Sequence, residues 1–188
     1  MSASWNNTQP WKAIITMGNL TNDFEDKLFL HATQNRNQLD SDFPFPTQYQ
    51  GIYNERRRDC AWQLYDSVGV VRGDREASAR QSGENFRLFG APHVAIVTSP
   101  KDLGTYGALD CGIYISNFML AAQSQDVSTA TQAAIAKYSS FVRNYFGISP
   151  DRAVVCGISF GYADREHSAN NFRTRRAAVN EVAEFRWG

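Results

Sequence analysis

Hydrophobic and polar residues recur along the chain with two different periods, and each period predicts a different kind of element. Short runs rich in β-branched residues predict three strands, at residues 12–16, 93–98 and 153–162. Apolar residues at helical spacing predict five helices, at about residues 21–34, 53–68, 75–88, 106–123 and 132–146. Both kinds of element are mixed throughout the chain, which indicates a domain built from a sheet and helices.

Three parts of this pattern carry more specific expectations. Thr21 and Asn22 are the candidate capping residues of the first helix. Residues 35–51 are polar and interrupted by proline, which predicts a loop. Residues 106–123 contain a single charge, Asp110, and apolar residues on every side. Such a pattern predicts a helix that is buried all round, in the core or in a subunit interface.

Composition narrows the class of protein. The chain has 188 residues, 43% of them hydrophobic, which suits one domain with a sizeable core. Lys and Arg together number 19, as do Asp and Glu, so the net charge is zero and no overall field favours nucleic acid or an anionic membrane. The longest nearly uncharged run, residues 109–122, is too short to span a bilayer. We therefore expect a soluble protein that binds neither nucleic acid nor membrane.

The cysteines suggest a compartment. Cys60, Cys111 and Cys156 are odd in number, far apart, and in neither a pairing nor a zinc spacing. This usage predicts a reducing compartment, the cytoplasm, with the thiols serving as small apolar fillers.

One motif matches a hydrolase signature in its residues but not in its surrounding sequence. Residues 157–161 fit the G-x-S-x-G nucleophile elbow, which requires a strand, a sharp turn and a helix, with Asp and His following the serine. Here the sequence alternates like a strand through Ser159, and the only later histidine is His167. Ser159 is therefore predicted to be an ordinary strand residue, and no catalytic side chain is assigned.

Other polar residues favour structural interpretations. The charged run at residues 55–59 is typical of a solvated helix face. His31 lies on a predicted helix and His93 at the start of a predicted strand, and neither has a second ligand type at metal spacing. No metal site is therefore predicted.

The opening residues resemble a known family. Ser4, Asn7, Gln9, Pro10 and Trp11 match the Ser-x-x-Asn-x-Gln-Pro-Trp signature of the nitroreductase family, flavoenzymes that bind FMN at the interface of a homodimer. Further blocks follow in family order and extend the resemblance over nearly the whole chain: Asn85-Phe86, residues 89–92, LGTYGALDCGIYISNFMLAAQS at 103–124, GISFGYAD at 157–164 and NNFRTRRAAVNEV at 170–182.

The resemblance implies a fold and an assembly. It predicts an α+β nitroreductase-like fold, with a central, mostly antiparallel sheet flanked by helices, as a single domain over residues 1–188. It also predicts an intertwined homodimer, with the helix at 106–123 in the position of the central dimer helix of the family.

The resemblance further places the opening residues at the cofactor. The pyrimidine edge of a flavin alternates hydrogen-bond donors and acceptors, and a primary amide can bind both because it carries an NH₂ donor and a carbonyl acceptor. Asn7 and Gln9, with the hydroxyl of Ser4, are therefore predicted to bind that edge or the ribityl chain, in the flavin of the partner subunit. A cofactor and a second chain would then hold a terminus that would otherwise fray.

A second cofactor segment is predicted around residue 132. Flavin N5 needs a nearby backbone N–H to stabilise the charge that develops on hydride transfer. The resemblance places Thr131, Gln132 and Ala133 there, followed by Ala134, with Thr131 in place of the usual proline. Asp126 stands where glycine is common, which predicts a strained or reshaped turn.

The FMN phosphate calls for cationic donors, and a guanidinium group binds it through paired hydrogen bonds. Arg173 and Arg176 match the basic positions of the family near the carboxyl terminus. Family members also carry an upstream helix and an arm with an Arg-Arg-Ser type motif that grips this phosphate, and the sequence begins after the place of that arm. Either the protein starts further upstream, or it is a shortened member whose FMN binding is weaker by several orders of magnitude, at about 1.5–3 kcal/mol per lost bond.

The function implied is that of an FMN-dependent oxidoreductase. Hydride from NADH or NADPH would pass by a ping-pong scheme to a small electron-poor acceptor such as a nitroaromatic or quinone, with protons from water. Two alternatives stay open. One is a flavin-deficient relative with a binding or regulatory role, and the other is a flavoenzyme of the same fold that performs dehalogenation or flavin fragmentation.

Overall fold

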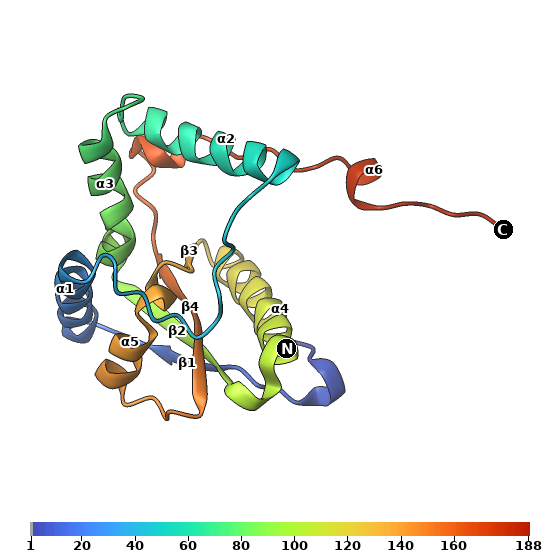
Figure 1. Ribbon diagram of the computed structural model, residues 1–188, viewed down its shortest axis with the longest axis horizontal. Helices are drawn as coiled ribbons and strands as arrows, with labels where there is room; N and C mark the ends of the chain where they lie inside the picture. The colour runs from blue at the N-terminus through green and yellow to red at the C-terminus, as the bar shows by residue number, and fades with distance from the viewer. Residues whose placement is uncertain (1) are drawn as a thin grey trace. The chain divides into compact units, whose positions relative to one another are not determined.

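The computed structural model describes residues 2–188 and divides into two compact units, drawn in Figure 1. The first unit contains the chain up to Pro46 and Ala79–Ala163, and the second contains Thr47–Ser78 and Asp164–Gly188. Each unit is described by itself.

A four-stranded sheet forms the centre of the first unit. Its strands are β1 (Lys12–Ile15), β2 (His93–Pro100), β3 (Ser128–Gln132) and β4 (Arg152–Gly161), in the order β1-β2-β4-β3. Every neighbouring pair is antiparallel. The three predicted strands and the antiparallel sheet are confirmed. Strand β3 was missed, because its sequence, STATQ, is short and lacks a large apolar residue.

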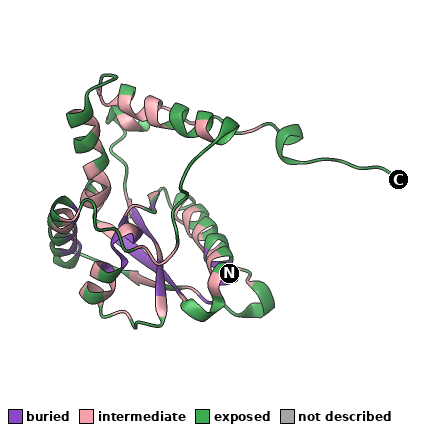
Figure 2. Ribbon diagram, in the orientation of Figure 1, coloured by how far each residue is buried: buried purple, intermediate pink, exposed green. Residues whose placement is uncertain are grey.

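Burial on both faces of β2 explains why helices cover the sheet on two sides. Val94 and Ile96 pack into one buried cluster, and Ala95 and Val97 pack into another. Successive side chains of a strand point to opposite faces, so these four residues belong to two separate hydrophobic layers. Figure 2 shows buried residues concentrated along the strands.

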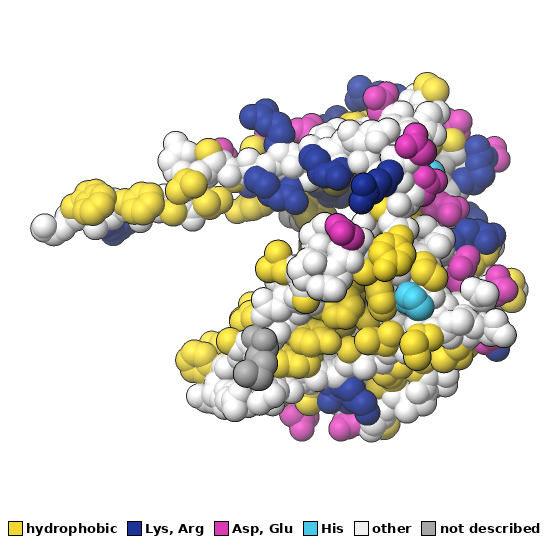
Figure 3. Space-filling view, turned by 180° about the vertical axis from the view of Figure 1, so that it is seen from behind, with side chains coloured by type: hydrophobic (Ala, Val, Ile, Leu, Met, Phe, Trp, Pro, Cys, Tyr) yellow, Lys and Arg dark blue, Asp and Glu magenta, His cyan; other side chains and the backbone are white. Residues whose placement is uncertain are grey.

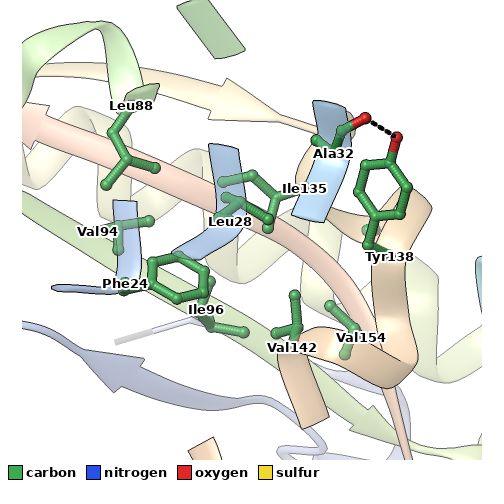
Figure 4. Packing of buried hydrophobic residues seen from close by; sticks show 11 residues of the cluster. Phe24, Leu28, Ala32, Leu88, Val94, Ile96, Ile135, Tyr138, Val142 and Val154 are labelled. Atoms are coloured by element: carbon green, nitrogen blue, oxygen red, sulfur yellow. Dashed lines mark hydrogen bonds between the residues drawn. The ribbon is translucent and has the colours of Figure 1, made fainter. Parts of the chain in front are cut away.

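The larger cluster lies between the sheet and a group of helices, and Figure 4 shows its packing. Helix α1 (Asn19–Gln34) contributes Phe24, Leu28 and Ala32 at helical spacing. The other helical elements of this cluster are η2 (Glu84–Gly90), η4 (Ile135–Tyr138) and α5 (Ser139–Phe146). The hydroxyl of Tyr138 donates a hydrogen bond to the carbonyl oxygen of Ala32, which ties η4 to the end of α1.

Two boundaries in this layer differ from the sequence prediction. Helix α1 begins at Asn19 after Gly18, so Thr21 and Asn22 lie inside the helix and do not cap it. The Thr21 hydroxyl is buried, 2.8 Å from that of Thr16. The predicted helix at 132–146 begins only at residue 135, because Gln132 pairs with β4 as the last residue of β3. A hydrophobic period cannot separate a strand end from a helix start when a tight turn joins them.

Helix α4 (Gly104–Gln123) follows η3 (Lys101–Leu103) and covers the smaller cluster through Cys111. The prediction that this helix is buried all round is wrong for the single chain. Only Gly107, Asp110 and Cys111 are buried in it, and Tyr106, Leu109, Ile113 and Leu120 are exposed. One face of the helix therefore packs on the sheet, and the other presents apolar side chains.

The loop predicted at residues 35–51 contains no helix or strand up to Gln50. Asp42 fixes its first half to the first unit. Its carboxylate is paired with Arg143, lies 3.9 Å from Lys101 and accepts the backbone N–H of Val154 over 2.8 Å.

The second unit consists of α2 (Gly51–Ser67), the first four residues of α3 (Arg75–Gly83), η5 (Ser168–Asn170) and α6 (Val179–Val182). The helix predicted at 75–88 therefore ends five residues early, where η2 begins. No residue of α2 is buried. Cys60 on α2 is exposed, so it is not the apolar filler that was predicted, whereas Cys111 and Cys156 are buried.

The carboxyl-terminal residues of this unit expose apolar side chains along an extended segment, visible in Figure 3. They are Val179, Val182, Phe185 and Trp187. Among residues 2–188, the helices fall short of the length and apolar character needed to cross a membrane.

Candidate functional site

The amino-terminal turn, defined here as residues 4–9, gathers three of the predicted cofactor residues. The hydroxyl oxygen of Ser4 accepts the backbone N–H of Gln9 over 2.9 Å. The side-chain nitrogen of Gln9 donates to the side-chain oxygen of Asn7 over 3.0 Å. Both amides are exposed. The turn therefore presents two primary amides side by side, already oriented by their mutual bond.

The backbone of this turn is unusual. Asn6, Asn7 and Gln9 have φ angles of 48°, 56° and 46°, in the left-handed region that most L residues avoid. Asparagine tolerates this region better than other non-glycine residues, which explains the adjacent asparagines. Such a conformation costs free energy and persists only when the surroundings impose it.

Asp110 of α4 supplies that constraint. Its carboxylate accepts the backbone N–H of Trp5 over 2.9 Å and the hydroxyl of Thr8 over 3.3 Å, although Asp110 is only 5% exposed. The Trp5 ring also lies against Tyr106, with centroids 5.9 Å apart. The single charge of α4 thus holds the amino-terminal turn on its own chain.

The chain that leaves the turn is fixed as well. The Trp11 ring stacks on Tyr114 of α4, with centroids 5.3 Å apart. The guanidinium of Arg152 donates to the carbonyl oxygen of Pro10 and to both the hydroxyl and the carbonyl oxygen of Thr98, each over 2.8 Å. These contacts join the turn to α4, β2 and β4.

The second predicted cofactor segment lies where β3 ends. Thr131 and Ala133 are exposed, and Ala134 is half-buried. Within the described residues, the backbone N–H groups of Ala133 and Ala134 donate no hydrogen bond. Two adjacent N–H groups are therefore available to a ligand at this turn. The hydroxyl of Thr131 lies 3.2 Å from the Met119 sulfur of α4.

Gln132 differs from its neighbours because its side chain is buried, at 2% exposure. Its amide oxygen accepts a hydrogen bond from the Ser159 hydroxyl, and its amide nitrogen donates to the carbonyl oxygen of Asn85 over 2.7 Å. The side chain therefore bonds to β4 and η2. Sequence reasoning missed this arrangement, which places Gln132 inside the unit rather than on the surface of the turn.

Ser159 is a buried residue of β4, as predicted, and the segment has no nucleophile elbow. The glycines of its motif have packing roles. A Cβ at Gly157 would lie 2.4 Å from the Cδ1 of Ile135, and one at Gly161 would lie 2.6 Å from the Cδ of Pro92. These contacts explain the small residues at both positions without any catalytic role.

Asp126 lies in the turn between α4 and β3 with a φ angle of 57°. A residue other than glycine in this conformation is strained, so the expectation at this position is confirmed.

Arg173 and Arg176 belong to the second unit, and both are exposed. Each guanidinium donates to residues at most three positions away in the chain: Arg173 to the carbonyl oxygens of Asn170 and Phe172, and Arg176 to residues 174 and 175. These bonds use one terminal nitrogen of each guanidinium. Further N–H donors on both side chains are left for an anion.

With this geometry in view, comparison with known proteins identifies the class. The sequence pattern of the Nitroreductase family matches residues 1–162. The chain belongs to the nitroreductase family, and it has the α+β fold of that family.

Individual relatives make the comparison more specific. The chain is 33% identical to the nitroreductase NfnB of Mycolicibacterium smegmatis over 180 residues, covering 95% of this chain and 76% of that protein. It is 30% identical to a 4-nitrobenzoate reductase of Pseudomonas putida, covering 98% and 81%. The crystal structure of the FMN-dependent nitroreductase NfnB from Mycobacterium smegmatis in complex with NADPH matches with a TM-score of 0.93 at 32% identity, over 99% of this chain and 83% of that one.

Proposed function

We propose that this chain is an FMN-dependent oxidoreductase that takes hydride from NADH or NADPH and reduces a small electron-poor acceptor, such as a nitroaromatic or quinone. One observation carries the proposal: nearly the whole chain matches an FMN-dependent nitroreductase solved with NADPH, at a TM-score of 0.93. A relative named as a 4-nitrobenzoate reductase supports a nitroaromatic acceptor.

The donors on the amino-terminal turn suit the flavin by their chemistry. The bond between Asn7 and Gln9 uses the oxygen of one amide and the nitrogen of the other. A donor on Asn7 and an acceptor on Gln9 are left, which complement the alternating groups of a pyrimidine edge. The Ser4 hydroxyl already accepts one bond and can donate another. Asp110 holds the turn that carries these groups through its bonds to Trp5 and Thr8.

The turn after β3 supplies the other half of the proposed site. FMN, when bound, supplies the hydride transfer between nicotinamide and acceptor. The N–H groups of Ala133 and Ala134 stabilise negative charge that develops near them, because fixed backbone dipoles need no reorganisation during the reaction. No side chain has to act as nucleophile, and Arg173 with Arg176 would bind the phosphate.

We also propose that the protein is a homodimer formed through α4. The exposed residues Tyr106, Leu109, Ile113 and Leu120 follow one another at helical spacing, and they are 43% to 66% exposed. A contiguous apolar face of this kind is typical of a surface that another protein covers. Substituting Ile113 by Asp should convert the dimer to monomer in size-exclusion chromatography with light scattering, whereas Gln34→Asp, at an exposed position of α1, should not.

Two further proposals concern the domain organisation and the location of the protein. We propose a single nitroreductase-like domain over residues 1–188, because the match to NfnB covers 99% of the chain. We propose the cytoplasm as its location, since Cys60, Cys111 and Cys156 are all unpaired.

The central test is the addition of FMN to flavin-free protein. Bound FMN should turn the protein yellow, NADPH should bleach it without oxygen, and 4-nitrobenzoate should restore the colour. Protein that stays colourless with excess FMN would contradict the cofactor assignment. Protein that binds FMN but is bleached by neither NADH nor NADPH would contradict the electron donor.

A further inference from the structure

We propose that Gln132 is a positioning residue: its buried side chain holds the backbone N–H groups of Ala133 and Ala134 in the orientation in which they can bind FMN. The inference rests on the proposed function for the ligand, but its geometry is that of this chain alone. It gives the buried amide a role that differs from direct contact with the cofactor.

The first step is the position of Gln132 in the chain. It is the last residue of β3, paired with Gly157, and the next residue already belongs to the turn with the unbonded N–H groups. Any shift of Gln132 therefore moves the peptide that carries the N–H of Ala133. The side chain is 2% exposed, so it makes no contact with solvent that could replace its bonds.

The second step is that the amide can adopt only one orientation. The Asn85 partner is a backbone carbonyl, which accepts and cannot donate, so the NH₂ of Gln132 must face it. The oxygen then faces the Ser159 hydroxyl, which donates to it. A flipped amide would bring two acceptor oxygens together. This pair of bonds therefore fixes both the rotamer and the direction of the side chain.

The third step is what the amide joins. Ser159 is on β4 and is itself 2% exposed, and Asn85 is on η2. Within η2, Leu88 and Phe89 both have φ angles of 53°, and Gly90 follows at 72°. The left-handed backbone of Leu88 and Phe89 needs an external constraint, and the bond from Gln132 is one that reaches this element from the sheet. The same side chain thus holds the turn after β3 and the segment that leads into β2.

The test compares Gln132→Met, which keeps the size of the side chain but removes both polar ends, with the matched control Gln125→Met. Gln125 is exposed, and its side-chain nitrogen donates to the carbonyl oxygen of Ser124 next to it in the chain. In flavin-free protein, amide hydrogen exchange at Ala136 and Lys137, whose N–H groups bond to the carbonyl oxygens of Ala133 and Ala134, should be about tenfold faster in Gln132→Met and unchanged in Gln125→Met. With FMN bound, the equilibrium constant for its two-electron reduction should differ about tenfold between Gln132→Met and wild type, which equals about 30 mV in reduction potential.

A conservative variant separates positioning from mere packing. Protonated glutamic acid at position 132 can accept from Ser159 and donate to Asn85, as glutamine does, whereas the carboxylate only accepts. Gln132→Glu should therefore match wild-type FMN affinity at low pH and lose at least tenfold as pH rises and the carboxyl ionises. Wild type and Gln132→Met, measured in the same buffers, should lack this pH-dependent difference.

The outcomes distinguish this inference from the proposed function. If wild type binds no FMN, the proposed function fails, and the exchange experiment still decides the role of Gln132. If wild type binds FMN but Gln132→Met shows unchanged exchange and unchanged reduction equilibrium, the inference is overturned. If Gln132→Met does not fold, Ser159→Ala, which removes one of the two bonds, is measured instead. Its exchange rate and its FMN reduction equilibrium should each change by about threefold. No change in either would overturn the inference equally.

Discussion

Two of the three proposed cofactor segments, the amino-terminal turn and the basic segment near the carboxyl terminus, are built in opposite ways. The amino-terminal turn is tied to buried elements of its own unit by Asp110 and, through Pro10, by Arg152. The basic segment, defined here as residues 171–178, contains Arg173 and Arg176 and bonds only to residues close in sequence. The first therefore has a defined geometry without any ligand, whereas the second has donors but little to fix them. A ligand should change the second far more than the first.

The cysteines give the largest expected contrast between buried and exposed parts of the molecule. Burial raises the pKa of Cys111 to about 11 and that of Cys156 to about 12, so both thiols stay protonated at neutral pH. At pH 8 a thiol with a pKa of about 11 is thiolate in only about one molecule in a thousand.

We therefore expect iodoacetamide at pH 8 to modify Cys60 and leave the other two intact, as intact-protein mass spectrometry would show. The reactivity of Cys111 should rise with pH, because its thiolate fraction grows toward the raised pKa. Rapid modification of all three cysteines at pH 8 would mean that the first unit opens readily.

Asp110→Ala should damage the amino-terminal turn most. It removes two hydrogen bonds to a buried carboxylate, one of them from the backbone N–H of Trp5, at about 1.5–3 kcal/mol for each charged bond. We expect a loss of about 3 kcal/mol in the free energy of unfolding and about a hundredfold in FMN affinity. Chemical unfolding and FMN titration would measure the two effects. Asp102→Ala, which removes an exposed carboxylate of η3, is the control and should change neither.

The double substitution of Arg173 and Arg176 by Ala should lower FMN affinity while leaving stability nearly unchanged, unlike Asp110→Ala, which lowers both. Exposed side chains contribute little to stability, so the free energy of unfolding should stay within about 0.5 kcal/mol. FMN affinity should fall at least tenfold if the two guanidinium groups bind the phosphate, and the loss should shrink at high salt, because salt screens the attraction between exposed charges. Lys101→Ala with Lys12→Ala controls for the removal of two positive charges. Unchanged FMN affinity in the arginine variant would show that the phosphate binds elsewhere.

The smallest effect is expected at Asp126. Glycine relieves its left-handed backbone but loosens the unfolded chain, and the two effects nearly cancel, leaving a gain of at most about 0.5 kcal/mol. Alanine has the strain without the local hydrogen bonding that aspartate offers in turns, so Asp126→Ala should lose about 1 kcal/mol. Thermal unfolding would order the variants as glycine, then aspartate, then alanine. An alanine variant as stable as wild type would mean that the turn changes conformation.

Much of the fold was predictable because its elements have strong local patterns. Strands β2 and β4 are dense in β-branched and apolar residues, and α1 repeats Phe24, Leu28 and Ala32 at helical spacing. Strand β3 was not predictable, because its five residues owe their extended form to pairing with β4 rather than to their own composition.

The site divides in the same way. Ser4, Asn7 and Gln9 could be selected from the sequence through their resemblance to the nitroreductase signature, and their amide and hydroxyl groups suit a flavin edge by chemistry. The role of Asp110 could have been suspected, since an isolated carboxylate in an apolar helix needs a partner. That Trp5 and Thr8 are its partners depends on contacts across more than 100 positions of the chain.

The sequence by itself therefore determined the family, the kinds of element and the residue types available to a cofactor, because local periodicity and side-chain chemistry are properties of the chain. Only the tertiary structure decided that Gln132 points inward, that α4 leaves one apolar face open and that Asp110 holds the amino-terminal turn. Each of these depends on which distant groups meet, and a hydrogen bond or a buried contact exists only once the fold has brought its two partners together.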